Sequence, residues 1–117
     1  MRHRKKGRKL NRTAAHRKAT MKQLGSNLIR DERLITTVAK AKELRPFIEK
    51  IVTRAGEDTV HNRRQAKKKL NSDPAVKKLF EEIGPRFVER SGGYTRILKL
   101  DERKGDGTTR ALIEFVE

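Results

Sequence analysis

The sequence lacks cysteine and tryptophan entirely, and only five of its 117 residues are Phe or Tyr. Without cysteine the chain can form no disulfide, thiolate nucleophile, thiolate zinc site or iron–sulfur cluster. No stretch approaches 18 consecutive apolar residues, so nothing in the sequence predicts a membrane span. Positive charge is abundant instead, because 31 Lys and Arg against 15 Asp and Glu give a net charge of +16. These features predict a small, very basic protein with one domain.

Acidic residues are missing from the first thirty positions, which hold eleven Lys or Arg before the first carboxylate at Asp31. The other 87 residues hold 20 basic and 15 acidic side chains, a net of +5. A block of like charge repels itself and cannot collapse alone. We therefore predict that residues 1–12 are a basic extension that orders when an anion neutralises it. Residues 13–117 are expected to form a single domain.

Three kinds of role are compatible with this basic block. One is a solvated tail or sorting signal, since mitochondrial transit peptides are Arg-rich and poor in acid. A second is binding to an anionic membrane, which needs bulky apolar anchors beside the charge. The available anchors lie past the densest charge: Met21, Leu24, Leu28 and Ile29. The third is nucleic acid, which fits best because closely spaced cations match a polyphosphate and release its counterions.

Apolar residues recur at helical spacing in four segments and alternate in three others. We predict helices over about residues 13–29, 39–55, 58–70 and 73–83, and strands over 34–38, 94–103 and 110–116.

Proline, glycine and a capping residue refine the predicted course and ends of these helices. Pro46 lacks a backbone donor, so we expect a kink or break near Leu44-Arg45. Asp73 is expected to cap the fourth helix, with Pro74 at its first position. Gly84-Pro85 is expected to end that helix.

The last two strands flank Gly105-Asp106-Gly107, which is typical of a hairpin turn. A hairpin alone is marginally stable, so its apolar face needs a cover of helices. The early strand around Ile35 is expected to join it. The fold predicted is α+β: a two-layer sandwich of a small three-stranded mixed sheet covered by helices on one face, in the order α-β-α-α-α-β-β.

The sequence shows little sign of catalytic chemistry. His3, His16 and His61 lack metal-ligand spacing, and the adjacent Glu81-Glu82 is more typical of a solvated helix edge than of an acid/base pair. No phosphate-binding loop is present. The segment Gly92-Gly93-Tyr94-Thr95-Arg96 has two interpretations: a loop entering a strand with Tyr94 half-buried, or a close approach to RNA in which Tyr94 contacts a base. We expect no enzyme activity, metal, cofactor or small-molecule substrate.

The scarcity of aromatic residues bears on the kind of nucleic acid. A single-strand reader that stacks bases would show several exposed aromatics on its strands. This composition favours phosphate and shape contacts over base readout, and an extension that orders on binding suits a folded RNA. Composition by itself leaves open a ribosomal protein and a small chromatin or architectural protein.

Five motifs resemble, in order along the whole chain, the bacterial family of large-ribosomal-subunit protein seventeen. They are Met1–Arg12, Ile35–Arg45, Asn62-Arg63-Arg64, Gly84-Pro85-Arg86-Phe87 and Gly92–Ile97. The resemblance implies a structural component of the large (50S) subunit in the cytoplasm, bound to 23S ribosomal RNA without catalysis or a cofactor. It also implies a neighbour, small protein thirty-two of that subunit, and no self-association. The alternative is an architectural protein that binds duplex DNA.

The resemblance also implies which residues contact RNA. In the extension they are Arg2, His3, Arg4, Lys5, Lys6, Arg8, Lys9 and Arg12. Along the first helix they are His16, Arg17, Lys18 and Lys22, and further contacts are expected from Arg63, Arg64 and Arg96.

Overall fold

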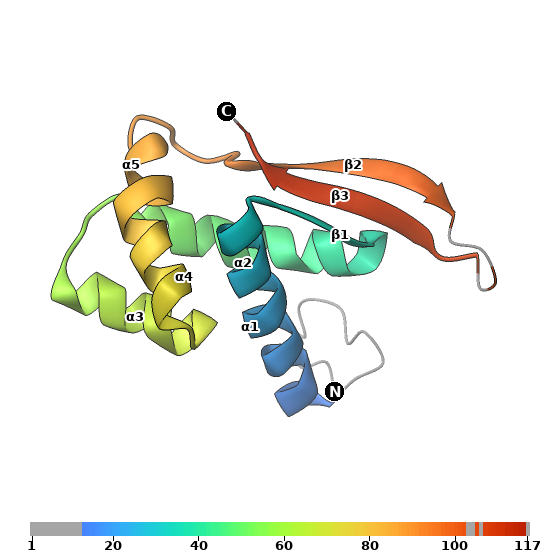
Figure 1. Cartoon of the computed structure of the whole chain (residues 1–117), viewed down its shortest axis with the longest axis horizontal. Coiled ribbons are helices and arrows are strands. Elements are labelled where there is room, and N and C mark those ends of the chain that lie inside the picture. Colours follow the sequence, from blue (N-terminus) through green and yellow to red (C-terminus); the bar gives the residue numbers. More distant parts are fainter. Residues whose placement is uncertain (1–12, 103–104, 106, 117) are drawn as a thin grey trace, which may run out of the picture.

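Helices cover one face of a three-stranded sheet in the computed structural model, which describes residues 13–102, 105 and 107–116 (Figure 1). The helices are α1 (Ala14–Asp31), α2 (Val38–Ala55), α3 (Val60–Leu70), and a continuous helical segment made of α4 (Asp73–Lys78), the π-helix η1 (Leu79–Ile83) and α5 (Gly84–Arg86). The strands are β1 (Arg33–Thr37), β2 (Thr95–Glu102) and β3 (Thr109–Phe115). The predicted fold class and element order are confirmed, while the expected extension at residues 1–12 lies outside the described residues.

The sheet has the order β1-β3-β2, and both pairs are antiparallel, so the expected mixed sheet is wrong. The reason is that β3, rather than β2, lies in the centre. The core side chains of β3 include Ala111, Ile113 and Phe115, and a central position buries such a strand best. Strands β1 and β2 run in the same direction, so they would form a parallel pair only if they were neighbours.

Helix α2 lies across the covered face of the sheet and contacts all three strands. Thr37 ends β1 and caps α2, accepting a hydrogen bond from the Lys40 amide. Pro46 does not break this helix, contrary to one of the two outcomes expected there. Pro46 is exposed, so water can bond the carbonyl that the missing N–H leaves free.

The fourth helical segment runs three residues past its predicted end. The Gly84 amide donates to the carbonyl of Leu79, five residues back, and the segment continues through Pro85 to Arg86. A wider π turn relieves the clash that a proline ring makes in a regular helix. Gly84 has an ordinary helical φ of −56°, so conformational freedom is not the reason for a glycine here. An added Cβ would lie 2.4 Å from the carbonyl oxygen of Ala55, so Gly84 permits close packing against α2.

Hydroxyl side chains cap the start of the main helices. Thr13 and Thr59 cap α1 and α3. The cap of α4 is Ser72, one residue before the expected Asp73, and its hydroxyl accepts from the Ala75 amide. Asp73 occupies the first turn and contacts Lys67 instead. The shift by one residue follows because Ser72, and not Asp73, has the extended backbone that an N-cap requires.

The other face of the sheet carries no helix in the described part of the chain. Ile35 of β1 and Leu98 of β2 both align with Leu112 of β3, forming one apolar row across the strands. Ile35 and Leu98 are 58% and 46% exposed. Among the described residues, no helix is both long and apolar enough to cross a membrane.

Candidate nucleic-acid interface

Eight of the predicted RNA contacts, those at positions 2–12, lie outside the described residues. The structure describes the other seven, and they fall on three separate surfaces: α1, α3 and the open face of the sheet.

Helix α1 packs into the protein by its second half and presents charge on its first. Its buried residues are Gly25, Leu28 and Ile29. Gly25 lets the helix approach its neighbours, since an added Cβ would lie 3.0 Å from the Phe47 ring and 3.1 Å from a Leu70 methyl group. The beginning of α1 lies away from the sheet (Figure 1).

The four predicted contacts on α1 are thereby gathered at one end of the domain. His16 and Lys18 are exposed, and Arg17 and Lys22 are half-buried. The first turn of α1 contains no acidic residue. This helix end therefore presents uncompensated positive charge, which is what a polyphosphate partner requires.

Arg63 and Arg64 lie side by side in sequence on α3 but have different surroundings. Arg63 forms a two-pronged pair with Asp58, with distances of 2.6 and 2.8 Å, and its guanidinium lies 5.3 Å from the centre of the Phe80 ring. The hydrogen bond from Arg63 lowers the pKa of the Asp58 carboxyl below its ordinary value. Arg64 is exposed. Arg63 thus stabilises contacts within the domain, whereas the exposed Arg64 is more accessible to a binding partner.

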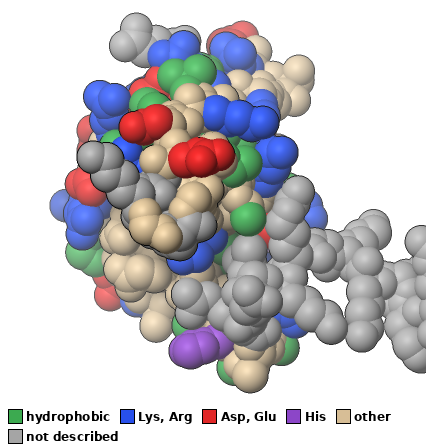
Figure 2. All heavy atoms as spheres, turned by 90° about the vertical axis from the view of Figure 1, so that its right-hand side faces the viewer, with side chains coloured by type: hydrophobic (Ala, Val, Ile, Leu, Met, Phe, Trp, Pro, Cys, Tyr) green, Lys and Arg blue, Asp and Glu red, His purple; other side chains and the backbone are tan. Residues whose placement is uncertain are grey.

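Arg96 lies on β2, opposite Glu114 of the neighbouring strand, and the two side chains pair at 2.6 Å. This pair belongs to the open face of the sheet, apart from α1. Seen from the hairpin end of β2 and β3, the molecule shows basic and acidic side chains interspersed over its upper part (Figure 2). Mixed charge of this kind gives a polyanion less attraction than the start of α1 does.

The structure decides between the two interpretations of the glycine-rich segment before β2. Tyr94 is 4% exposed, its hydroxyl lies 3.0 Å from that of Thr53, and its ring lies 5.3 Å from the Phe87 ring. The Tyr94 ring therefore has no exposed face that could stack on a base. Gly93 has a φ of +63°, and its amide donates to the Glu49 carboxylate. The segment is therefore a structural loop held against α2.

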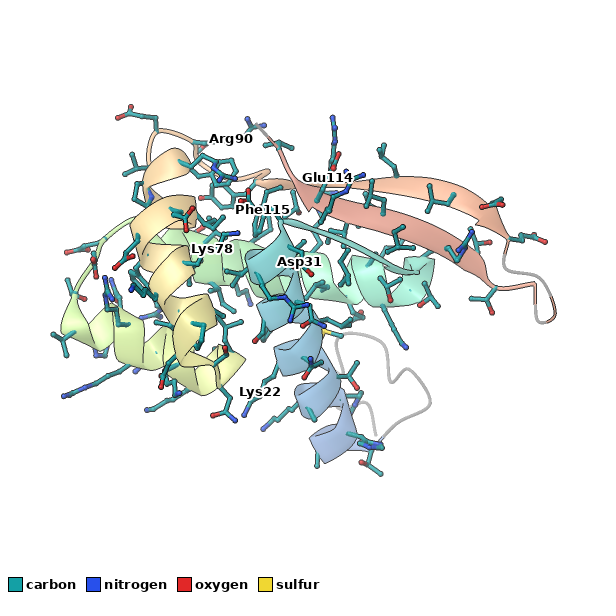
Figure 3. The ribbon with its side chains drawn as sticks, viewed as in Figure 1. Lys22, Asp31, Lys78, Arg90, Glu114 and Phe115 are labelled. Carbon is teal, nitrogen blue, oxygen red and sulfur yellow. The ribbon has the colours of Figure 1, made fainter. Side chains whose placement is uncertain are left out.

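A groove between α1 and α4 is absent from the sequence predictions. It has a volume of about 560 Å³, and its charged lining residues are Lys22, Arg30 and Lys78. Figure 3 shows Lys22 of α1 and Lys78 of α4 on the sides where the two helices face each other. The sequence gives little indication of this groove, because Lys78 is 48 residues from Arg30 and only the fold brings the two together.

No group of three or more His, Asp or Glu side chains in the described part of the chain could hold a metal ion. The described residues form two cationic surfaces, one at the start of α1 and one in the groove, and Lys22 belongs to both.

Comparisons with known proteins agree on one family. A family model described as "Ribosomal protein L17" matches residues 20–116. The large ribosomal subunit protein bL17 of Salinibacter ruber is 56% identical over 117 residues, which is all of this chain and 59% of that relative. The bL17 protein of Gemmatimonas aurantiaca is 52% identical over 116 residues, covering 99% of this chain and 98% of the relative. The chain belongs to the ribosomal protein L17 family.

Proposed function

We propose that this protein is a structural component of the large ribosomal subunit that binds 23S ribosomal RNA through phosphate and shape contacts. The observation that carries the proposal is the placement of charge. The acid-free segment that begins the chain leads into the end of α1 that projects beyond the core. The family supports the ribosomal setting, since the relatives named above are large-subunit proteins.

The proposed mechanism is electrostatic bridging. Cations at positions 2–12 and along the start of α1 neutralise phosphates where RNA segments converge, and the folded domain positions them. About 6–10 phosphate contacts would make binding fall by roughly 10³–10⁵-fold between about 50 and 200 mM salt.

The proposal includes no catalysis and no cofactor. It places the protein on cytoplasmic ribosomes, beside neighbouring large-subunit proteins. The family resemblance names small protein thirty-two as one such neighbour. The alternative, an architectural protein for duplex DNA, has no support from the family.

Deleting residues 2–12 tests the proposal. We expect the truncated protein to keep its helical circular dichroism but to bind a 23S RNA transcript much more weakly, with a shallower dependence on salt. Unchanged affinity and salt dependence would show that the extension does not bind RNA. Equal affinity of the full chain for plain duplex DNA would favour the architectural alternative.

Sedimentation of a cell lysate through a magnesium-containing gradient at high salt tests the location. The protein should travel with the large subunit. Finding it only at the top of the gradient would contradict the ribosomal assignment.

A further inference from the structure

None of the described residues that line the groove between α1 and α4 is Asp or Glu, although the chain has 15 of them. We propose that this groove holds the sugar–phosphate backbone of an RNA strand, as a second contact separate from the basic extension. The inference rests on the proposed RNA-binding function and adds a defined place and a chemical class of ligand to it.

The first wall of the groove is one side of α1. Its lining residues follow helical spacing: Ala19, Lys22, Gln23, Ser26, Asn27 and Arg30. Eleven steps of helix rise make this wall about 16 Å long, which suits a run of phosphates rather than a single anion. The opposite wall comes from the turn between α3 and α4 and from α4 itself, ending at Lys78.

Two internal contacts join the walls. The Ser26 hydroxyl donates to the Leu70 carbonyl at 3.0 Å, and the Lys78 ammonium donates to the Arg30 carbonyl at 2.8 Å. The groove is therefore formed in the free protein, so binding need not first bring its walls together.

The cations of the groove remain available to phosphate to different degrees. Lys78 also pairs with Glu32 at 3.2 Å and is only 23% exposed, so it acts as a fixed charge at one end. Arg30 pairs with Asp31 at 3.0 Å, but both side chains are more than half exposed. Such a surface pair contributes little free energy, and an incoming phosphate can compete for the guanidinium. Lys22 has no carboxylate partner in the described part of the chain.

The neutral residues of the groove also suit a nucleic-acid backbone. Gln23 donates to Asn27 at 3.3 Å, and Asn71 lines the groove from the α3–α4 turn. Amide side chains commonly hydrogen-bond phosphate and sugar oxygens.

A second concavity, between α2 and α3, has twice the volume at about 1150 Å³ but different charges. Its lining carries four cations, Lys42, Lys50, Arg54 and Lys69, but also three carboxylates, from Glu43, Glu49 and Glu57. Carboxylates repel a polyanion at close range, so the charge of the lining favours the smaller groove although its volume is lower.

Salt-dependent binding of the full chain to a 23S RNA transcript tests the proposal. Removing one phosphate contact should reduce the slope of log affinity against log salt by about 0.7–0.9, which is roughly a threefold effect between about 50 and 200 mM salt. We expect this reduction in both Lys22→Gln and Arg30→Gln, and twice as much in the double variant. Lys77→Gln, which alters an exposed lysine outside the groove, is the matched control and should leave the slope unchanged.

The outcomes separate the groove from the proposed function. If Arg30→Gln behaves like Lys77→Gln while the unaltered protein binds RNA, the groove is not a binding site but the function stands. If the unaltered protein does not bind the transcript, the proposed function fails and the groove with it.

The absence of cysteine permits a direct second test. A cysteine introduced as Gln23→Cys carries an iron chelate that generates hydroxyl radicals, and Lys77→Cys is the control on the same scaffold. We expect specific cleavage of the RNA transcript from position 23 that exceeds cleavage from position 77. Equal or absent cleavage from position 23 would overturn the proposal.

Discussion

The Glu49 carboxylate accepts two hydrogen bonds from Thr95, one from its amide and one from its hydroxyl, each 2.9 Å long. The other carboxylate oxygen accepts the Gly93 amide, also at 2.9 Å. One side chain of α2 therefore fixes the loop that leads into β2. Thr95 is only 2% exposed, so no water could replace this acceptor without rearrangement.

Replacing this acceptor should destabilise the fold. Glu49→Ala leaves the buried Thr95 groups unsatisfied, and we expect a loss of about 1–3 kcal/mol in the free energy of unfolding. Chemical denaturation followed by circular dichroism measures it. Glu89→Ala, at an exposed position, should change stability by less than about 0.5 kcal/mol. Equal losses in the two variants would contradict the role given to Glu49.

The approach of Gly84 to Ala55 predicts a second sensitive position. Gly84→Ala places a methyl group against the Ala55 backbone, so α2 and α5 must separate. Overpacking of this kind costs about 1–3 kcal/mol, which thermal or chemical unfolding would detect. Gly56→Ala is the control, because its nearest contact is 3.3 Å away and its φ is −63°. A Gly84→Ala variant as stable as Gly56→Ala would show that the two helices adjust freely.

Glu32 makes stability depend on pH. Its carboxylate contacts Arg86 and Lys78, and the hydrogen bond from Arg86 lowers its pKa below the ordinary 4.5. Because the folded pKa is the lower one, the stabilisation is present above pH 4.5 and is lost as pH falls through the folded value.

The variant Glu32→Gln should be less stable than the unaltered protein at neutral pH, and the difference should shrink on acidification. Unfolding free energies measured across this pH range test the prediction. Glu82→Gln, at an exposed site on the same α4–α5 segment that carries Lys78 and Arg86, serves as the control. A difference that stays constant down to low pH would exclude Glu32 as the titrating group.

Tyr94→Phe separates a structural from an RNA-binding role. The variant loses the hydroxyl that contacts Thr53, so stability should fall by about 0.5–1.5 kcal/mol. Affinity for the 23S RNA transcript should not change, because the ring is buried. Weakened RNA binding without any loss of stability would show that Tyr94 reaches the RNA.

Local chemistry explains which parts of the fold were predictable. Thr13 and Thr59 cap helices because their hydroxyls bond nearby amides, and Gly105 and Gly107 supply the positive φ values of the turn between β2 and β3. The central position of β3 and the π turn before Gly84 were not predictable in this way. Both result from packing between segments that are distant in sequence.

The same division holds for the candidate interface. The sequence alone determined the charge asymmetry, an acid-free first quarter of net +11 ahead of a remainder of net +5, and it predicted an anionic partner. Only the tertiary structure showed that Arg63 and Arg96 have carboxylate partners, that Tyr94 is buried, and that Arg30 and Lys78 face one groove. The physical reason is that composition determines net charge, whereas the neighbours of each charge depend on how helices and strands pack.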